Sequence, residues 1–147
     1  MILLQDADAT YQFGRRIAEL LQAGDVVTLD GPLGAGKTSL ARGILAGLGL
    51  LGEAPSPSFA IVQSYAPPEV RIPVLHVDLY RLEDASELRE LGLDEASGDP
   101  AMLIEWPDRA GPDAWPEALH LRIAPDPSGG RCLTPIISPR WENRWQT

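Results

Sequence analysis

One stretch decides the fold, and it reads Gly31-Pro32-Leu33-Gly34-Ala35-Gly36-Lys37-Thr38. It fits the pattern G-x-x-x-x-G-K-[ST], which is typical of a loop that binds phosphate groups. Glycines let the backbone adopt turns that other residues avoid, so several N–H groups can point toward one anion. The apolar run Val26–Leu29 precedes the stretch, and an amphipathic run, Lys37–Leu48, follows it. A buried strand, a phosphate loop and a helix are therefore predicted in that order.

The side chains at the end of this stretch suit a nucleotide with Mg²⁺. Lys37 reaches outer phosphates, and the Thr38 hydroxyl is a hard oxygen ligand for Mg²⁺. Ser39 can bond an inner phosphate, and the free N–H groups at the helix start attract anions. Lys37 is the only lysine of a chain that otherwise uses arginine. A compact ammonium on a thin stem is what the loop requires.

The base is predicted to be adenine, because guanine-reading residues are absent from the sequence. GTPases of this fold carry N-K-x-D, and no such tetrapeptide occurs. The D-x-x-G switch is also missing after the run that ends at Asp78, since Asp78-Leu79-Tyr80-Arg81 ends in arginine. ATP with Mg²⁺ is therefore the expected ligand.

Two carboxylates follow apolar runs and are candidates for the chemistry. Asp78 ends the run Pro73–Val77, and Glu105 ends the run Met102–Ile104. Ligand groups in open α/β sheets gather beyond the carboxyl ends of strands. Asp78 is thus expected to contact Mg²⁺ directly or through water, and Glu105 either to hold Mg²⁺ or to polarise the attacking water.

Other polar and aromatic residues near these motifs have more than one possible role. His76 shares a strand face with Asp78, and a structural role is favoured for it. Trp106 either shields the site or simply packs. Ser56 and Ser58 lie where related folds place a switch loop, with a proline-rich turn as the alternative. No role is assigned to His120.

The rest of the chain predicts one α/β domain over residues 1–147, with a core of about 8–125. A helix is expected over Asp8–Leu21, capped by Asp8 or Thr10. The further expected elements are strands Phe59–Tyr65 and Ile72–Asp78 as a hairpin, a helix Asp84–Leu91, strand Ala101–Glu105, a loop Pro107–Pro116, a strand over Leu119–Ile123 and an edge strand Cys132–Ile137. Together they predict a mixed, mostly parallel sheet flanked by helices. The tail holding Trp141 and Trp145 has no assignment.

Composition limits the kinds of partner and the cellular location that are expected for the protein. The chain has 147 residues, a net charge of −9 and a single cysteine, Cys132. Direct binding of DNA or RNA needs concentrated Lys and Arg, so a protein partner is the better expectation. The sequence contains no run of about 18 apolar residues, so no membrane span is predicted. The N-terminus does not resemble a secretion signal. One cysteine excludes an internal disulfide, and a cytoplasmic location is expected.

Four motifs in order resemble those of the TsaE (YjeE) family of tRNA threonylcarbamoyladenosine biosynthesis. The family carries G-D-L-G-A-G-K-T, S-P-T-F, H-x-D-x-Y-R-L and E-W-P. The corresponding stretches here are Gly31–Thr38, Ser56-Pro57-Ser58-Phe59, His76-Val77-Asp78-Leu79-Tyr80-Arg81-Leu82 and Glu105-Trp106-Pro107. The resemblance covers about residues 8–125. Pro32 replaces the usual Asp and Ser58 replaces Thr, while the phosphate-binding positions and the hydroxyl group are kept.

The resemblance implies an ATPase that acts on partner proteins. It implies that Gly34, Ala35, Gly36 and Lys37 hold phosphates and that Thr38 and Glu105 bind Mg²⁺, with Asp78 nearby. It also places Thr10 near the nucleotide, and it places Arg131 there as well. The family role is to bind a heterodimer of TsaB and TsaD and to reset it by ATP hydrolysis, so that tRNA is contacted only indirectly.

Two alternatives remain from the sequence. A small-molecule P-loop kinase would need an acceptor pocket and an Arg-bearing lid, whereas the acidic Asp94-Glu95 follows Gly92. A nucleotide-dependent switch module would bind without useful turnover. Since no arginine is clearly placed to stabilise the transition state, slow hydrolysis alone and stimulation by a partner are expected.

Overall fold

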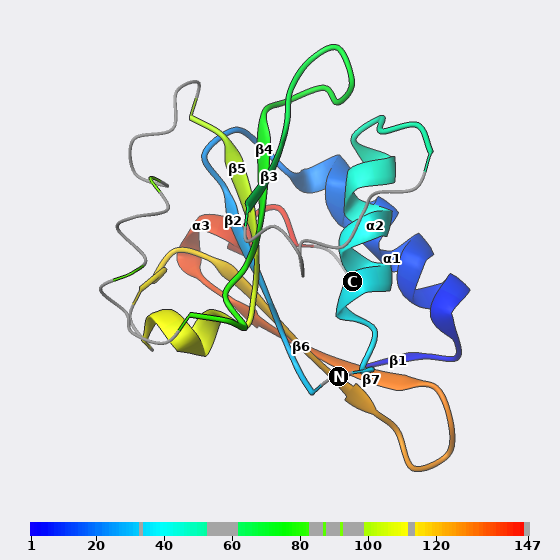
Figure 1. Cartoon of the computed structure of the whole chain (residues 1–147). Helices are drawn as coiled ribbons and strands as arrows, with labels where there is room; N and C mark the ends of the chain where they lie inside the picture. Colours follow the sequence, from blue (N-terminus) through cyan, green and yellow to red (C-terminus); the bar gives the residue numbers. More distant parts are fainter. Residues whose placement is uncertain are drawn as a thin grey trace.

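The computed structural model describes residues 1–32, 34–52, 62–82, 87, 92, 99–111 and 114–145. A seven-stranded sheet runs through this part of the chain in the order β1-β7-β6-β2-β5-β4-β3 (Figure 1). The four neighbours β6, β2, β5 and β4 are parallel. Strands β7 and β3 run against them, and β1 pairs antiparallel with β7. Five strands therefore share one direction, which confirms the mixed, mostly parallel sheet flanked by helices.

The bounds of the elements are as follows. The strands are β1 (Ile2–Leu4), β2 (Val26–Asp30), β3 (Val62–Tyr65), β4 (Val74–Asp78), β5 (Ala101–Glu105), β6 (Leu119–Pro125) and β7 (Arg131–Ile137). The helices are α1 (Ala7–Leu20), α2 (Lys37–Gly47), α3 (Pro139–Glu142) and the short 3-10 helix η3 (Pro107–Ala110). None of the described helices is long and apolar enough to cross a membrane.

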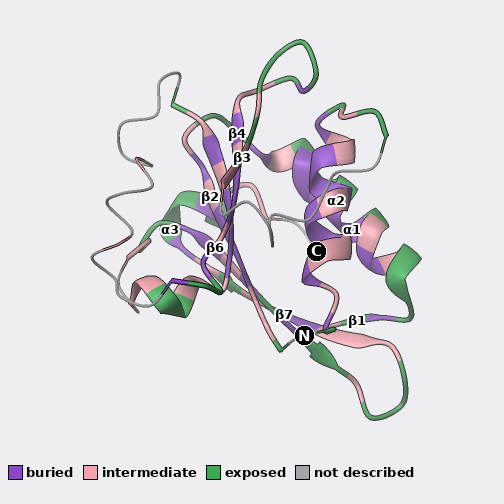
Figure 2. Cartoon of the chain, in the orientation of Figure 1, coloured by how far each residue is buried: buried purple, intermediate pink, exposed green. Residues whose placement is uncertain are grey.

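Helices α1 and α2 lie side by side on one face of the sheet (Figure 1). They approach closely because glycines stand at the crossing: a methyl group at Gly43 would overlap the backbone carbonyl of Tyr11, and one at Gly14 would overlap that of Leu40. Apolar residues of both helices and of the central strands form the larger core. Figure 2 shows this buried layer along the strands and on the helix sides that face them. The phosphate-loop helix is thereby fixed rigidly to α1.

A smaller apolar cluster joins strands β4 and β5 to the segments that follow them. Val77, Leu79, Leu82 and Ile104 are its buried members, and Trp106 and Trp115 pack against it. Burying apolar area on both faces of the central strands is the usual reason for near-continuous apolar runs in parallel strands. The run Ala101–Ile104 shows this pattern.

Several boundary predictions need correction. Asp6 caps α1, not Asp8 or Thr10, because its carboxylate accepts a hydrogen bond from the Ala9 N–H at 2.8 Å. Strand β7 is not at an edge, since β1 pairs on its outer side. Part of the expected loop after Pro107 is the 3-10 helix η3. The expected helix Asp84–Leu91 falls, except for Glu87, outside the described residues.

The C-terminal segment has a defined place in this fold. Trp141 on α3 is fully buried in the larger core. Arg140 and Arg144 both bond the buried carboxylate of Asp25, with Nε and Nη1 at 2.8 and 2.6 Å from its oxygens. Burial by itself would raise the pKa of Asp25. Hydrogen bonds from Arg144, from the Gln22 N–H and from Arg140 outweigh burial and hold that pKa below its usual value. The tail thus ties the start of β2 to the end of the chain.

Candidate functional site

The phosphate loop connects β2 to α2 at the carboxyl edge of the parallel strands (Figure 1). Gly31, Gly34 and Gly36 have φ values of 153°, 78° and 110°, which explains why the loop requires glycine. The first hydrogen bond of the helix runs from Leu40 N–H to the Gly36 carbonyl. The N–H groups of Lys37, Thr38 and Ser39 precede this first helical bond, and such a helix start attracts phosphate. Leu33 lies outside the described residues.

Lys37 is folded back onto its own loop. Its side chain is buried, and Nζ donates to the carbonyls of Gly31 and Pro32. The ammonium also lies 3.7 Å from the centre of the Trp106 ring, which is a cation–π contact. Burial lowers the pKa of Lys37. The negative charges of Glu105, then of Asp30, Asp78 and Asp108, oppose that shift. The cation is therefore held in a largely dry site facing acidic groups.

Asp78 and Glu105 meet as the sequence predicts. They are register partners at the ends of β4 and β5. The Asp78 carboxylate accepts a hydrogen bond from the Tyr80 N–H at 2.8 Å. Burial raises the pKa of Asp78, and the charge of Glu105 raises it further. Both carboxylates also act on Lys37, so the three charged groups share one electrostatic site.

Glu105 has a partner that the sequence did not reveal. His76 Nε2 lies 2.7 Å from Glu105 Oε2, and both side chains are buried. His76 Nδ1 is buried and has no hydrogen-bond partner in the part of the chain that the structure describes. The only signal in the sequence was that His76 lies two residues before Asp78 and so shares its strand face.

Thr10 and Arg131 come together at the start of α2. Arg131 Nη1 donates to Thr10 Oγ1 at 3.2 Å, and Thr10 Oγ1 donates to the Asp6 carbonyl at 3.0 Å. A side chain at Gly36 would meet the Arg131 guanidinium, so this arginine lies directly over the loop. Thr10 is fully buried, and its hydroxyl is already used twice. The pair therefore presents Arg131, and not Thr10, at the loop.

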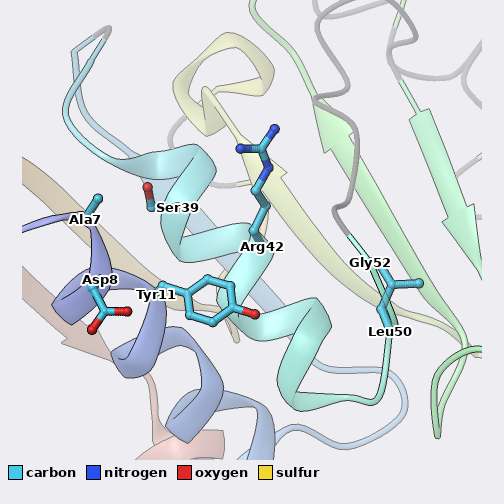
Figure 3. Close-up of a pocket in the computed structure, with 7 residues that line it drawn as sticks. All are labelled: Ala7, Asp8, Tyr11, Ser39, Arg42, Leu50 and Gly52. Atoms are coloured by element: carbon cyan, nitrogen blue, oxygen red, sulfur yellow. The ribbon is translucent and has the colours of Figure 1, made fainter.

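A cavity of about 420 Å³ opens beside the same helix start. Figure 3 shows it between α1 and α2, with Ser39 and Arg42 on one side and Ala7, Asp8 and Tyr11 on the other. Leu50 and Gly52, which follow α2, complete the lining. Its volume lies within the range of small-molecule sites. Sequence reasoning found Ser39 but not the residues of α1 that face it, because that proximity depends on how the helices cross.

The other residues that the sequence analysis singled out lie as follows. Ser56 and Ser58 lie outside the described residues. His120 Nδ1 is hydrogen-bonded to Thr28 Oγ1 at 2.6 Å. It lines another cavity together with Asp30 and Trp115. Trp106 both packs, with its ring 4.9 Å from that of Tyr80, and covers Lys37.

Comparison with known proteins identifies the family. The family model described as "Threonylcarbamoyl adenosine biosynthesis protein TsaE" matches residues 4–132. The chain belongs to the TsaE family. The match includes every candidate site residue from Thr10 to Arg131 and ends before the C-terminal tail.

Individual TsaE proteins show the same relationship. The chain is 42% identical over 113 residues to tRNA threonylcarbamoyladenosine biosynthesis protein TsaE of Streptomyces coelicolor, covering 76% of each chain. It is 43% identical over 113 residues to the TsaE of Synechocystis, covering 72% of this chain and 69% of the relative. The resemblance inferred from the four motifs is therefore confirmed.

The fold is also that of a solved structure. The crystal structure of Bacillus subtilis YdiB matches with a TM-score of 0.69 at 27% sequence identity, and the match covers 94% of this chain and 85% of that one. The two proteins therefore share their fold over most of this chain.

Proposed function

We propose that this TsaE-family protein binds ATP with Mg²⁺ on the phosphate loop and hydrolyses it to support tRNA N6-threonylcarbamoyladenosine formation. The observation that carries the proposal is the convergence of Lys37, Asp78 and Glu105 beside the loop. A glycine-rich loop supplies N–H groups, a lysine supplies positive charge, and two in-register acids supply oxygen ligands. Phosphoryl transfer depends almost entirely on such positioning and charge.

The donor set fits Mg²⁺ held together with a nucleotide. The Thr38 hydroxyl and the carboxylates of Asp78 and Glu105 are hard oxygen donors, which Mg²⁺ prefers. Among the described residues, no group of three His, Cys, Asp or Glu side chains could hold a metal by itself. Mg²⁺ usually takes one or two carboxylates and completes its shell with phosphates and water. When bound there, the ion would neutralise charge on the outer phosphates.

The other residues are assigned by their places around the loop. Backbone N–H groups of Gly34 and Gly36 hold phosphate oxygens, and that of Ala35 does so after leaving the Pro32 carbonyl, to which it donates at 3.2 Å. Lys37 likewise turns its ammonium from the Gly31 carbonyl to the outer phosphate. Arg131, steadied by Thr10, lies over the loop. Ser39 contacts an inner phosphate, and the nucleoside extends toward the cavity that Ser39 and Tyr11 line.

Hydrolysis needs a placed water and a group to take its proton. Asp78 suits the proton acceptor, because burial raises its pKa and makes its carboxylate more basic. Glu105, already bonded to His76, suits the metal-ligand role. The water oxygen attacks the terminal phosphorus, the bond to the ADP oxygen breaks, and ADP and phosphate leave. Arg131 lies over the loop but is bonded to Thr10, and Arg109 lies against the Tyr80 ring, so neither is assigned to the charge that develops at the terminal phosphate. We therefore expect slow turnover in the protein alone.

We further propose that stimulation comes from a TsaB–TsaD heterodimer in the cytoplasm and that ATP turnover resets that complex. The net charge of −9 supports a protein partner, with tRNA contacted only indirectly and no contact with DNA or a membrane. A partner that orders the site or adds a positive charge there would supply what the isolated protein lacks.

Nucleotide binding tests the first part of this proposal. Calorimetry with a non-hydrolysable ATP analogue and its GTP counterpart, each with and without Mg²⁺, should show tighter binding of the ATP form and dependence on Mg²⁺. Lys37→Ala should abolish that binding. Equal affinity for both analogues would favour a switch module, and binding that survives in Lys37→Ala would contradict the site.

A further inference from the structure

The buried contact between His76 and Glu105 carries information beyond the role of the two carboxylates. His76 Nε2 lies 2.7 Å from Glu105 Oε2, and the two side chains are 2% and 6% exposed. His76 is the register partner of Leu103, while Glu105 lies two residues farther along β5, opposite Asp78. The imidazole and the Asp78 carboxylate therefore flank Glu105 from the same strand.

The bond fixes the arrangement of protons on the ring. An ionised carboxylate can only accept hydrogen bonds, so His76 Nε2 must carry the hydrogen. In the neutral ring, Nδ1 is then a bare acceptor, and it is buried with no hydrogen-bond partner among the described residues. Leaving a buried polar atom unpaired is unfavourable. The bond to Glu105 is therefore the polar contact that accounts for a histidine in this buried place.

We propose that His76 is a positioning residue that holds Oε2 of Glu105 and thereby fixes the orientation in which the carboxylate is offered to a ligand at the phosphate loop. This inference rests on the proposed nucleotide site. Carboxylates that bind metals are typically oriented by a further hydrogen bond, and loss of that bond weakens metal affinity. The bond also keeps the Glu105 carboxylate beside β4. Without the bond, the carboxylate would be free to pair with the buried ammonium of Lys37.

Two substitutions of His76 separate positioning from packing. In His76→Gln the amide nitrogen comes close to the place of Nε2, so the bond to Glu105 is retained. In His76→Asn the amide lies near the place of Nδ1, so the bond is lost while a polar side chain remains. The readout is the Mg²⁺ concentration required for half-maximal binding of a non-hydrolysable ATP analogue, followed by calorimetry.

We expect His76→Asn to need about 10–100-fold more Mg²⁺ for half-maximal binding. We expect the Mg²⁺ requirement of His76→Gln to stay within about threefold of the wild-type value, because the bond to Glu105 is kept. In a Glu105→Ala background, which has no side-chain oxygen for His76 to hold, His76→Asn should have no further effect. Equal behaviour of the two His76 variants would overturn the proposal. If the wild type bound no nucleotide, the proposed function would fail instead, so the two failures are distinguishable.

A second measurement needs no variant and covers the case in which His76→Asn does not fold. Nitrogen-15 NMR of the imidazole in the wild-type protein should show the Nε2–H tautomer, with a proton protected from solvent exchange. A ring with its hydrogen on Nδ1 would overturn the inference, because Nε2 could then not donate to Glu105.

Discussion

Asp78 and Glu105 are register partners on neighbouring parallel strands, yet they have different surroundings. Glu105 is bonded to His76, whereas Asp78 accepts the Tyr80 N–H. Burial raises the pKa of Asp78, and the charge of Glu105 raises it further. In the function proposed above, these different surroundings would make Asp78 the better proton acceptor and Glu105 the better-oriented ligand.

The first prediction concerns Asp78→Asn. A carboxyl group whose folded pKa lies above its unfolded value destabilises the fold in its charged form. That penalty grows as pH rises from about 4 through the raised folded pKa and is fully present above it. Asp78→Asn keeps the oxygen that accepts the Tyr80 N–H and removes the charge. We expect the nucleotide-free variant to melt a few degrees higher at pH 7. Each kcal/mol gained in the free energy of unfolding raises Tm by about 2–4 °C.

Thermal melts between pH 4 and pH 8 measure this effect, and nucleotide binding provides the comparison. The gain in Tm should shrink toward pH 4, while Mg²⁺-dependent nucleotide binding should weaken at all pH values. A variant that melts at or below the wild-type temperature at pH 7 would show that Asp78 is not strained by its burial.

The second prediction concerns Trp141 in the tail. Its side chain is fully buried in the larger core, so Trp141→Ala removes a large apolar group and leaves a cavity. We expect a loss of about 3–5 kcal/mol in the free energy of unfolding, measured by urea denaturation. Trp145 is the matched control, since it is only partly buried against Phe13 and should cost clearly less as Trp145→Ala. A loss for Trp141→Ala no larger than that for Trp145→Ala would contradict the full burial of Trp141.

The third prediction is a pH dependence at Asp25. Its pKa is held below the usual value, so its ionised form stabilises the fold above about pH 4. That stabilisation is lost as pH falls through the lowered folded pKa. Asp25→Asn should therefore cost about 1–3 kcal/mol at pH 7, which is a moderate value for a broken ion pair because Arg140 is partly exposed. Urea denaturation at a series of pH values should show the wild type and the variant converging below pH 4. A constant difference would contradict the linkage.

Much of the central site was predictable because local sequence encodes it. The stretch Gly31–Thr38 specifies strand, loop and helix together, and its glycines take the positive φ values that the pattern requires. Asp78 and Glu105 were found because each ends an apolar run. Parallel strands bring such ends to one edge.

The features that were missed depend on pairing between distant segments. Strand β1 has three residues, too few for a periodic signal, and it exists because β7 offers an open edge. The burial of Trp141 and the contact between His76 and Glu105 also join segments far apart in sequence. At α1, the expected caps were wrong because Asp6, earlier in the chain, reaches the first free N–H groups. That residues 1–147 form one domain stays a prediction.

ATP turnover by the purified protein, alone and with purified TsaB–TsaD, tests the central claim most directly, with Lys37→Ala as the control. We predict slow turnover alone, a rise of at least about tenfold with the heterodimer, and no turnover in Lys37→Ala under either condition. Equal turnover with and without the heterodimer would contradict the partner-coupled role and leave only an uncoupled nucleotide site.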